Sequence, residues 1–132
     1  MKKLLIIAIV LISTVKSYGQ TKGNMKEFDS NFAHTVYFWL ENPNKEEDRK
    51  AFIASLRKFL NASKYAKTSF IGYPPKASRD VVDGSFTFSL IVSFASAEAQ
   101  QKYQEEDVHL KFIEESSKLW TKVIVYDSID AE

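Results

Sequence analysis

The chain contains two histidines, His34 and His109, and no cysteine, so imidazole is its best candidate for acid–base chemistry. Abstraction of a proton next to a carbonyl needs a base whose pKa lies near ambient pH and a donor that holds the enolate oxygen. An imidazole suits the first role, and a tyrosine hydroxyl suits the second. Such chemistry would require the fold to bring a histidine and a tyrosine to one apolar pocket.

The sequence disfavours several other kinds of site. The absence of cysteine excludes disulfides, thiolate metal sites and cysteine nucleophiles. No serine stands in a Gly-x-Ser-x-Gly elbow, and the chain has no glycine-rich phosphate loop. The histidines lack the His-x-x-x-His spacing of a zinc site, so we expect neither a metal nor a cofactor. A formal net charge of +1 gives no electrostatic footprint for nucleic acid.

Four strands are predicted from the alternation of apolar and polar residues. They are expected at residues 33–40, 67–73, 86–94 and 120–127, and the third shows the clearest period of two. Paired prolines end the second strand, and a polar loop over residues 76–85 separates it from the third. The length of 132 residues allows one globular domain.

Helices are predicted between the first and second strands and between the third and fourth. Asn44 is placed to cap the first helix, with Glu47 three residues later. Its apolar side recurs at helical spacing and comprises Phe52, Leu56, Phe59 and Leu60. Ser96 is expected to cap a second helix that runs to about residue 104, and Asp107 is expected to cap a third.

The order β-α-β-β-α-β predicts an α+β fold, with a ferredoxin-like protomer whose four-stranded antiparallel sheet carries its helices on one face. The strands also place large side chains on the other face, namely Tyr37, Trp39, Ile91, Ile124 and Tyr126. A core of this size cannot easily leave such residues in water. We therefore expect a homodimer whose two sheets pair face to face in an eight-stranded, dimeric α+β barrel.

The first 19 residues have the pattern of a secretory signal peptide. A positive start is followed by an unbroken apolar run over residues 4–12, and Ser17 and Gly19 are small residues before a cut at Gln20. The run is too short to cross a bilayer as a helix, so we expect no stable membrane anchor after cleavage. The protein is expected to be exported to the periplasm or secreted, with residues 20–30 as a flexible lead-in.

From residue 31 to residue 128 the chain resembles the stress-responsive A/B barrel (Dabb) family of dimeric α+β barrels. The resemblance is carried by residues 34–38, 84–94, 103–112 and 123–127. It implies the ferredoxin-like protomer and the barrel dimer, and it leaves residues 129–132 as a C-terminal tail. Asp107 stands where many members have a proline.

The resemblance also implies a candidate site. A few similar proteins are polyketide cyclases that work without metal or cofactor, through a tyrosine and a histidine six residues later. These positions match Tyr103 and His109 here, and His34 from the first strand is expected to join them. The pocket would be lined by residues on the helix-facing surfaces, namely Phe52, Leu56, Phe88, Val123 and Val125.

Three functions remain open from the sequence. The first is a module that binds a small hydrophobic or aromatic molecule, and the second is a cofactor-free cyclase, isomerase or lyase with His109 as base and Tyr103 as acid or oxyanion donor. The third is a purely structural or interaction dimer, in which His109 would be bonded to backbone and His34 would only orient its neighbours. A cavity beside His109 would favour the first two, whereas solid packing there would favour the third.

Overall fold

The computed structural model of the protein describes residues 26–77 and 79–132, and these residues contain the sheet and its helices. The predicted signal peptide and residues 20–25 of the predicted lead-in lie outside the described residues. Within the rest of that lead-in, the Asp29 amide donates a hydrogen bond to Ser93 Oγ at 3.2 Å. No helix in the described part of the chain is long and apolar enough to cross a membrane.

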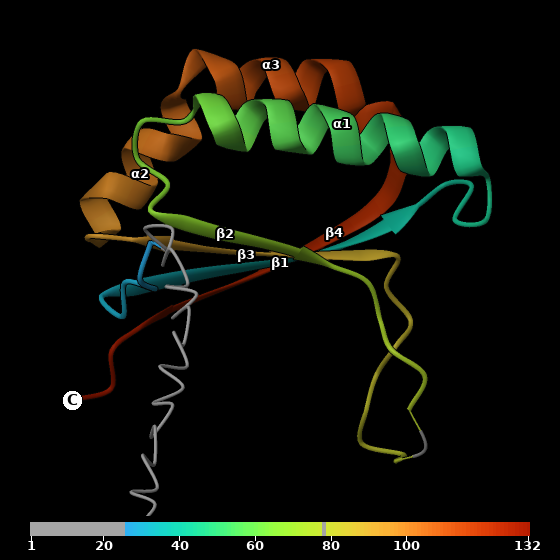
Figure 1. The fold of residues 1–132 in the computed structure, drawn as a ribbon, viewed down its shortest axis with the longest axis horizontal. Coiled ribbons are helices and arrows are strands. Elements are labelled where there is room, and N and C mark those ends of the chain that lie inside the picture. Colours follow the sequence, from blue (N-terminus) through green and yellow to red (C-terminus); the bar gives the residue numbers. More distant parts are fainter. Residues whose placement is uncertain (1–25, 78) are drawn as a thin grey trace, which may run out of the picture.

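Four strands form one antiparallel sheet with helices on one side (Figure 1). The elements are β1 (Phe32–Leu40), α1 (Glu46–Ala62), β2 (Thr68–Gly72), β3 (Phe88–Phe94), α2 (Ala97–Glu105), α3 (Asp107–Ser116), a 3-10 turn (Ser117–Leu119) and β4 (Trp120–Ile129). The strand order across the sheet is β2-β3-β1-β4. The predicted α+β, ferredoxin-like protomer is therefore confirmed.

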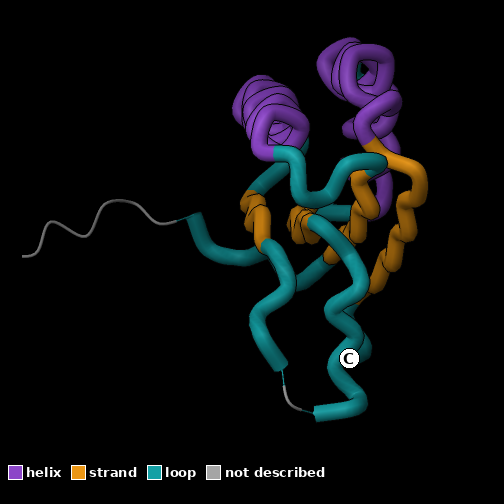
Figure 2. Tube along the Cα trace, turned by 90° about the vertical axis from the view of Figure 1, so that its right-hand side faces the viewer, coloured by secondary structure: helices purple, strands orange, loops and turns teal. Residues whose placement is uncertain are grey.

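β1 alternates between the two faces of the sheet along its whole length. Every second residue from Phe32 to Leu40 is buried, and the residues between them are half-buried. In the register of the sheet, His34 lies opposite Val92 of β3 and Asp127 of β4. Helices α1 and α3 cover only one face, and Figure 2 shows the strands between that helical layer and the loops on the other side. The alternation thus sends His34 towards the helices.

The core is a cluster of aromatic rings under α1, and Phe52 is at its centre. The predicted apolar side of α1 is buried in full. Phe52 stacks on Phe88 with ring centroids 5.3 Å apart, and it makes edge contacts with Phe38, Phe112 and Trp120. Aromatic pairs of these geometries stabilise a core beyond the area that they bury. The first turn of α1 carries three acidic residues, which favours the positive end of the helix dipole.

One of the three predicted helix caps is confirmed, and two are wrong. Ser96 Oγ accepts a hydrogen bond from the Ala99 amide at 3.1 Å. Asn44 does not cap α1, because the turn continues to Lys45 and the helix begins at Glu46.

Asp107 does not cap α3 either, because Glu106 occupies the N-cap position and Asp107 is already helical. The Glu106 carboxylate instead accepts hydrogen bonds from Ser63 Oγ at 2.6 Å and from the Lys64 amide at 2.7 Å. The joint between α2 and α3 is therefore tied to the end of α1.

Within the described chain, the face of the sheet opposite the helices is covered only at one end, where Phe86 packs on Tyr37 with ring centroids 4.8 Å apart and Ser85 Oγ accepts a hydrogen bond from Trp39 Nε1. The five residues expected at a dimer contact lie on this open face, and Tyr126 is 62% exposed. The loop between β2 and β3 projects from the same side (Figure 1). A hollow of about 550 Å³ there is lined by Tyr37, Trp39, Ile124 and Tyr126 together with residues of that loop. Polar residues, among them Ser89 and Lys122, line it as well, and an exposed group of aromatic side chains with polar neighbours is typical of a protein contact.

Removal of the central ring should cost much of the stability of the fold. We expect Phe52→Ala to lower the free energy of unfolding by about 3–5 kcal/mol, because the ring is fully buried and its cavity cannot collapse among four aromatic neighbours. Urea denaturation measures this difference. Phe28→Ala is the matched control, since that ring is 51% exposed, and its effect should stay within about 0.5 kcal/mol. Equal losses in the two variants would contradict this account of the core.

Candidate functional site

A cavity of about 290 Å³ lies between the helices and the sheet and contains the three polar side chains singled out from the sequence. His34 comes from β1, Tyr103 from α2 and His109 from the first turns of α3. The remaining lining is apolar except for Gln104, and it comprises Val36, Phe38, Phe59, Leu90, Phe112, Ile113, Trp120, Val123 and Val125. A mostly apolar pocket with a few convergent polar groups is typical of a small-molecule site.

His34 is held by a carboxylate on the neighbouring strand. Its Nδ1 lies 2.5 Å from Asp127 Oδ1, and the two residues face each other across the β1–β4 ladder. An ionised carboxylate only accepts hydrogen bonds, so His34 Nδ1 donates this one. In the neutral form of the ring, Nε2 then carries no proton and keeps its lone pair. The His34 side chain is 6% exposed and that of Asp127 is 41% exposed, so the carboxylate stays in contact with water.

Tyr103 is packed among aromatic rings from three elements. Its ring centroid lies 4.8 Å from Phe94, 5.0 Å from Phe59 and 5.9 Å from His34. Burial, and to a smaller extent the Glu106 carboxylate, raises the pKa of the Tyr103 hydroxyl well above its usual range. The phenol therefore stays protonated at physiological pH and can act as a hydrogen-bond donor.

His109 has one ring nitrogen anchored and the other available. Its Nδ1 lies 3.0 Å from the Gln104 carbonyl oxygen, so Nδ1–H donates this bond and Nε2 keeps the lone pair. Burial lowers the pKa of His109, and the nearby His34 lowers it further, against the opposing effects of the Gln104 carbonyl and the Glu106 carboxylate. A neutral imidazole with a free Nε2 is the form that a general base requires.

The arrangement brings all three polar residues together, but only two of the five predicted wall residues line this cavity. Val123 and Val125 belong to its β4 wall. Phe52 and Leu56 do not line it, because both are completely buried in the core under α1. Phe88 lies in a different hollow, between α1 and β2. No group of three His, Asp or Glu side chains within residues 26–77 and 79–132 is placed to hold a metal ion.

The family model of the stress responsive A/B barrel domain matches residues 32–130. The chain belongs to this family. The matched residues include every strand and helix in the described part of the chain. None of the curated proteins compared with the chain matches it.

Solved structures of similar fold include a Dabb family protein from Mesorhizobium loti with a ferredoxin-like fold. It is 20% identical, with 76% of this chain and 97% of that chain covered and a TM-score of 0.65. A hydroxynitrile lyase from Passiflora edulis is also 20% identical, with 76% and 94% covered and a TM-score of 0.65. A dimeric ferredoxin-like protein of unknown function from Bacteroides fragilis is 13% identical, with 79% and 100% covered and a TM-score of 0.61. At these identities the likeness shows the fold alone.

Within this A/B barrel domain, Gln104, which lines the cavity, and Asp127, which holds His34, are polar residues of the site that the sequence pattern does not single out. In the sequence, Asp127 stands only at the end of the fourth predicted strand. The signal that points to Asp127 is the period of two along β4, which puts Val123, Val125 and Asp127 on one face. That signal becomes specific only once β4 is known to pair with β1, since the pairing sets Asp127 opposite His34.

The electrostatics of the A/B barrel cavity can be measured through His109. We expect its ring to titrate, by NMR, below the ordinary histidine pKa of about 6.5 in the folded protein and near that value in urea. Folding lowers the pKa of His109, so the neutral ring contributes its full share of the folding stability above about pH 6.5. This contribution is lost as the pH falls through the lower pKa of the folded protein. His34→Asn should raise the pKa of His109, because His34 is one of the groups that lower it. A folded pKa above that in urea would contradict the burial of this ring.

Proposed function

We propose that this protein is an exported homodimer that binds a small, uncharged hydrophobic or aromatic molecule in the cavity of each protomer. The observation that carries the proposal is the convergence of His34, Tyr103 and His109 on an otherwise apolar cavity. None of the 13 described lining residues carries a permanent charge, so a charged ligand would lose its hydration without gaining a counterion. An uncharged ligand meets no such penalty.

The hydrogen-bonding groups define the ligand further. The Tyr103 hydroxyl can donate to a carbonyl oxygen, whereas the Nε2 atoms of His34 and His109 can accept from a hydroxyl. A buried ligand that leaves these groups unpaired would be disfavoured, because each unmet hydrogen bond costs about 1–3 kcal/mol. The favoured ligand is therefore an apolar molecule that carries both a carbonyl or hydroxyl acceptor and a hydroxyl donor.

Acid–base catalysis is the second candidate, and the shifted pKa values of His109 and Tyr103 favour it. One structurally similar protein is a hydroxynitrile lyase. In a reaction of that type, His109 Nε2 would take the hydroxyl proton of the substrate as the carbon–cyanide bond breaks. The bonding electrons would leave with cyanide, which would recover the proton, while Tyr103 would donate to the developing carbonyl oxygen. The step requires no cofactor and no redox change.

A purely structural dimer is disfavoured by the same cavity. If His109 served only to hold the fold together, bulky side chains would be expected to fill the space beside it. The space of about 290 Å³ instead reaches from His109 to His34 and Tyr103. Three of its wall residues, Ile113, Val123 and Val125, are between 37% and 47% exposed, so a small molecule can enter this space from solvent.

The homodimer is supported by the apolar open face of the sheet and by relatives described as dimeric. Similar ferredoxin-like proteins from Thermobifida fusca and Bacteroides fragilis are both dimeric. Pairing of two open faces would cover Tyr37, Trp39, Ile124 and Tyr126 of each protomer and close the expected barrel. Export is supported by the signal-peptide pattern of residues 1–19.

Binding in the cavity can be tested with acetophenone as an uncharged aromatic probe and benzoate as its charged counterpart. We expect acetophenone to shift the NMR signals of the Val123 and Val125 methyl groups and benzoate to leave them unchanged. Tyr103→Phe should weaken acetophenone binding about fivefold through the loss of one hydrogen bond. Asn44→Asp, at an exposed turn, is the control and should have no effect. Equal binding of both probes in the cavity would contradict the proposal.

Catalysis is separated from binding by mandelonitrile cleavage, measured against the spontaneous rate in buffer. If the second candidate holds, His109→Gln should reduce turnover by about 10²-fold or more, while acetophenone affinity changes less than about threefold. Wild-type turnover that His109→Gln leaves intact would exclude His109 as the base. A lack of wild-type turnover would remove this lyase reaction and leave the binding proposal in place.

The homodimer predicts that a charge on the open face gives monomers. Native mass spectrometry of the purified protein should show a dimer for the wild type and a monomer for Ile124→Lys, because the substitution would bury an unpaired ammonium in the contact. Val81→Lys, in the exposed loop, is the control and should remain dimeric. The subunit mass also reports whether the chain begins at Gln20. A monomeric wild type at high concentration would contradict the barrel.

A further inference from the structure

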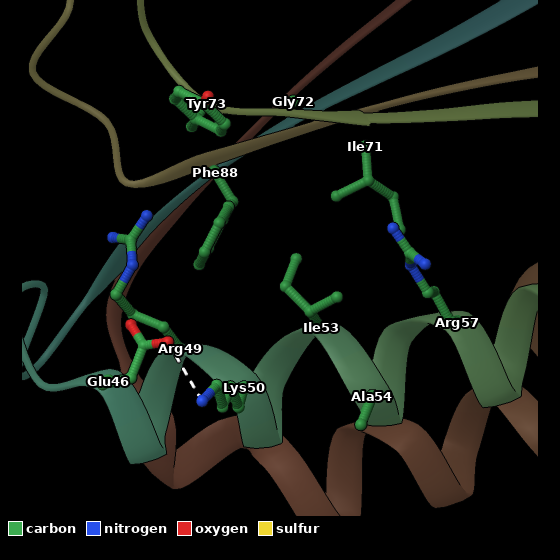
Figure 3. A pocket seen from close by; sticks show the side chains of 10 residues that line it. All are labelled: Glu46, Arg49, Lys50, Ile53, Ala54, Arg57, Ile71, Gly72, Tyr73 and Phe88. Carbon is green, nitrogen blue, oxygen red and sulfur yellow. Dashed lines mark ion pairs between the residues drawn. The ribbon is translucent and has the colours of Figure 1, made fainter.

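A second hollow lies between α1 and the edge strand β2 and shares no residue with the cavity of His34 and His109 (Figure 3). Its volume is about 550 Å³. The residues that line it are Glu46, Arg49, Lys50, Ile53, Ala54, Arg57, Ile71, Gly72, Tyr73 and Phe88. It lies on the helix-covered side of the sheet, and it shares only Gly72 and Tyr73 with the hollow on the open face. The core of the proposed dimer contact therefore leaves it accessible.

The α1 side of this hollow carries three cations, Arg49, Lys50 and Arg57, and Arg49, Ile53 and Arg57 follow one another at intervals of four residues along the helix. None of the three cations belongs to the buried side of α1, which comprises Phe52, Leu56, Phe59 and Leu60. Over the described residues, Lys50 is paired with Glu46 at 3.2 Å, whereas no carboxylate lies within 4.0 Å of either guanidinium. Two positive charges thus face the hollow without a counterion from the described chain.

The two guanidinium groups flank an apolar floor. In Figure 3, Arg49 and Arg57 extend from α1 towards the sheet on opposite sides of Ile53. Arg49 Cζ lies 4.6 Å from the centre of the Phe88 ring, and Arg49 Nη1 donates a hydrogen bond to the Pro43 carbonyl oxygen at 2.8 Å. Ile53 and Ile71 are only partly buried against the core. The hollow therefore offers cations at its sides and exposed apolar surface between them.

We propose that this hollow binds an organic carboxylate with an apolar alkyl or aryl body. Guanidinium groups match carboxylates in geometry as well as in charge, and Arg57 has the freedom to form a bidentate pair. The apolar body would cover Ile53 and Ile71, which are only partly buried, and remove them from water. The uncharged ligand proposed for the other cavity and this anionic ligand differ in charge, so the two sites can be tested apart.

Octanoate and octan-1-ol are suitable probes, because they share a chain and differ in charge. We expect octanoate to shift the NMR signals of Ile53 and Ile71 without shifting those of His109, and to bind at least about fivefold more tightly than octan-1-ol. Arg57→Gln should reduce octanoate affinity about fivefold to tenfold. Lys58→Gln removes the same charge from the next position of the same helix, outside the hollow, and should reduce it less than twofold.

A second variant keeps the test independent of Arg57. Ile53→Asp would place a carboxylate on the floor, repel octanoate and abolish the shifts at Ile71, while a thermal melt verifies that the protein remains folded. Equal losses in Arg57→Gln and Lys58→Gln would overturn the proposal, since they would show attraction to the overall charge of the helix. It would also be overturned by octan-1-ol binding as tightly as octanoate, or by shifts confined to the cavity of His109.

Discussion

The alternation of side chains along β1 is the constraint on which the rest of the structure depends. β1 is hydrogen-bonded to β3 on one side and to β4 on the other, so its register is fixed by two ladders. That register points His34 to the helices and Tyr37 and Trp39 to the open face. A slip of one residue would exchange these sets, separating His34 from Asp127 and placing an indole in the core. The polar cavity and the apolar open face are two results of one register.

Packing around the cavity favours the uncharged forms of Tyr103 and His109. The Phe59 ring lies 5.0 Å from both the Tyr103 ring and the His109 ring, and so contributes to the burial of both. Burial disfavours the imidazolium of His109 and the phenolate of Tyr103 alike, which lowers one pKa and raises the other. The walls of the cavity thus set the chemistry of its polar groups. A ligand there meets neutral donors and acceptors with fixed directions rather than charges.

The fold could be predicted from the sequence because periods of two and of 3.6 residues report backbone geometry directly. Ser96 could be recognised as a cap for the same local reason. Asn44 and Asp107 fit the same local pattern and yet do not cap, because the path of the chain decides which residue stands at the helix end. At α1 the turn after Pro43 extends to Lys45, and at α3 the bonds from Ser63 and Lys64 hold Glu106 in place.

The polar part of the candidate site was also accessible from the sequence, whereas its walls and Asp127 were not. Asp127 acquires its contact with His34 only through the pairing of the first and last strands, which no local pattern encodes. The wall residues were misplaced for a related reason. Periodicity identifies the face on which a residue lies, but the position along that face depends on how the helices cross the sheet.

Phe88 shows how far apart two positions on one face can be. It pairs with Phe38 on β1, four residues from His34, which is about 13 Å along the strand. Phe52 contacts Phe38, Phe112 and Trp120, which line the cavity, and also stacks on Phe88, which lines the hollow between α1 and β2. Phe52, which the sequence places on a pocket wall, therefore lies between the cavity of His109 and the cationic hollow and separates them. Its complete burial keeps the two environments separate.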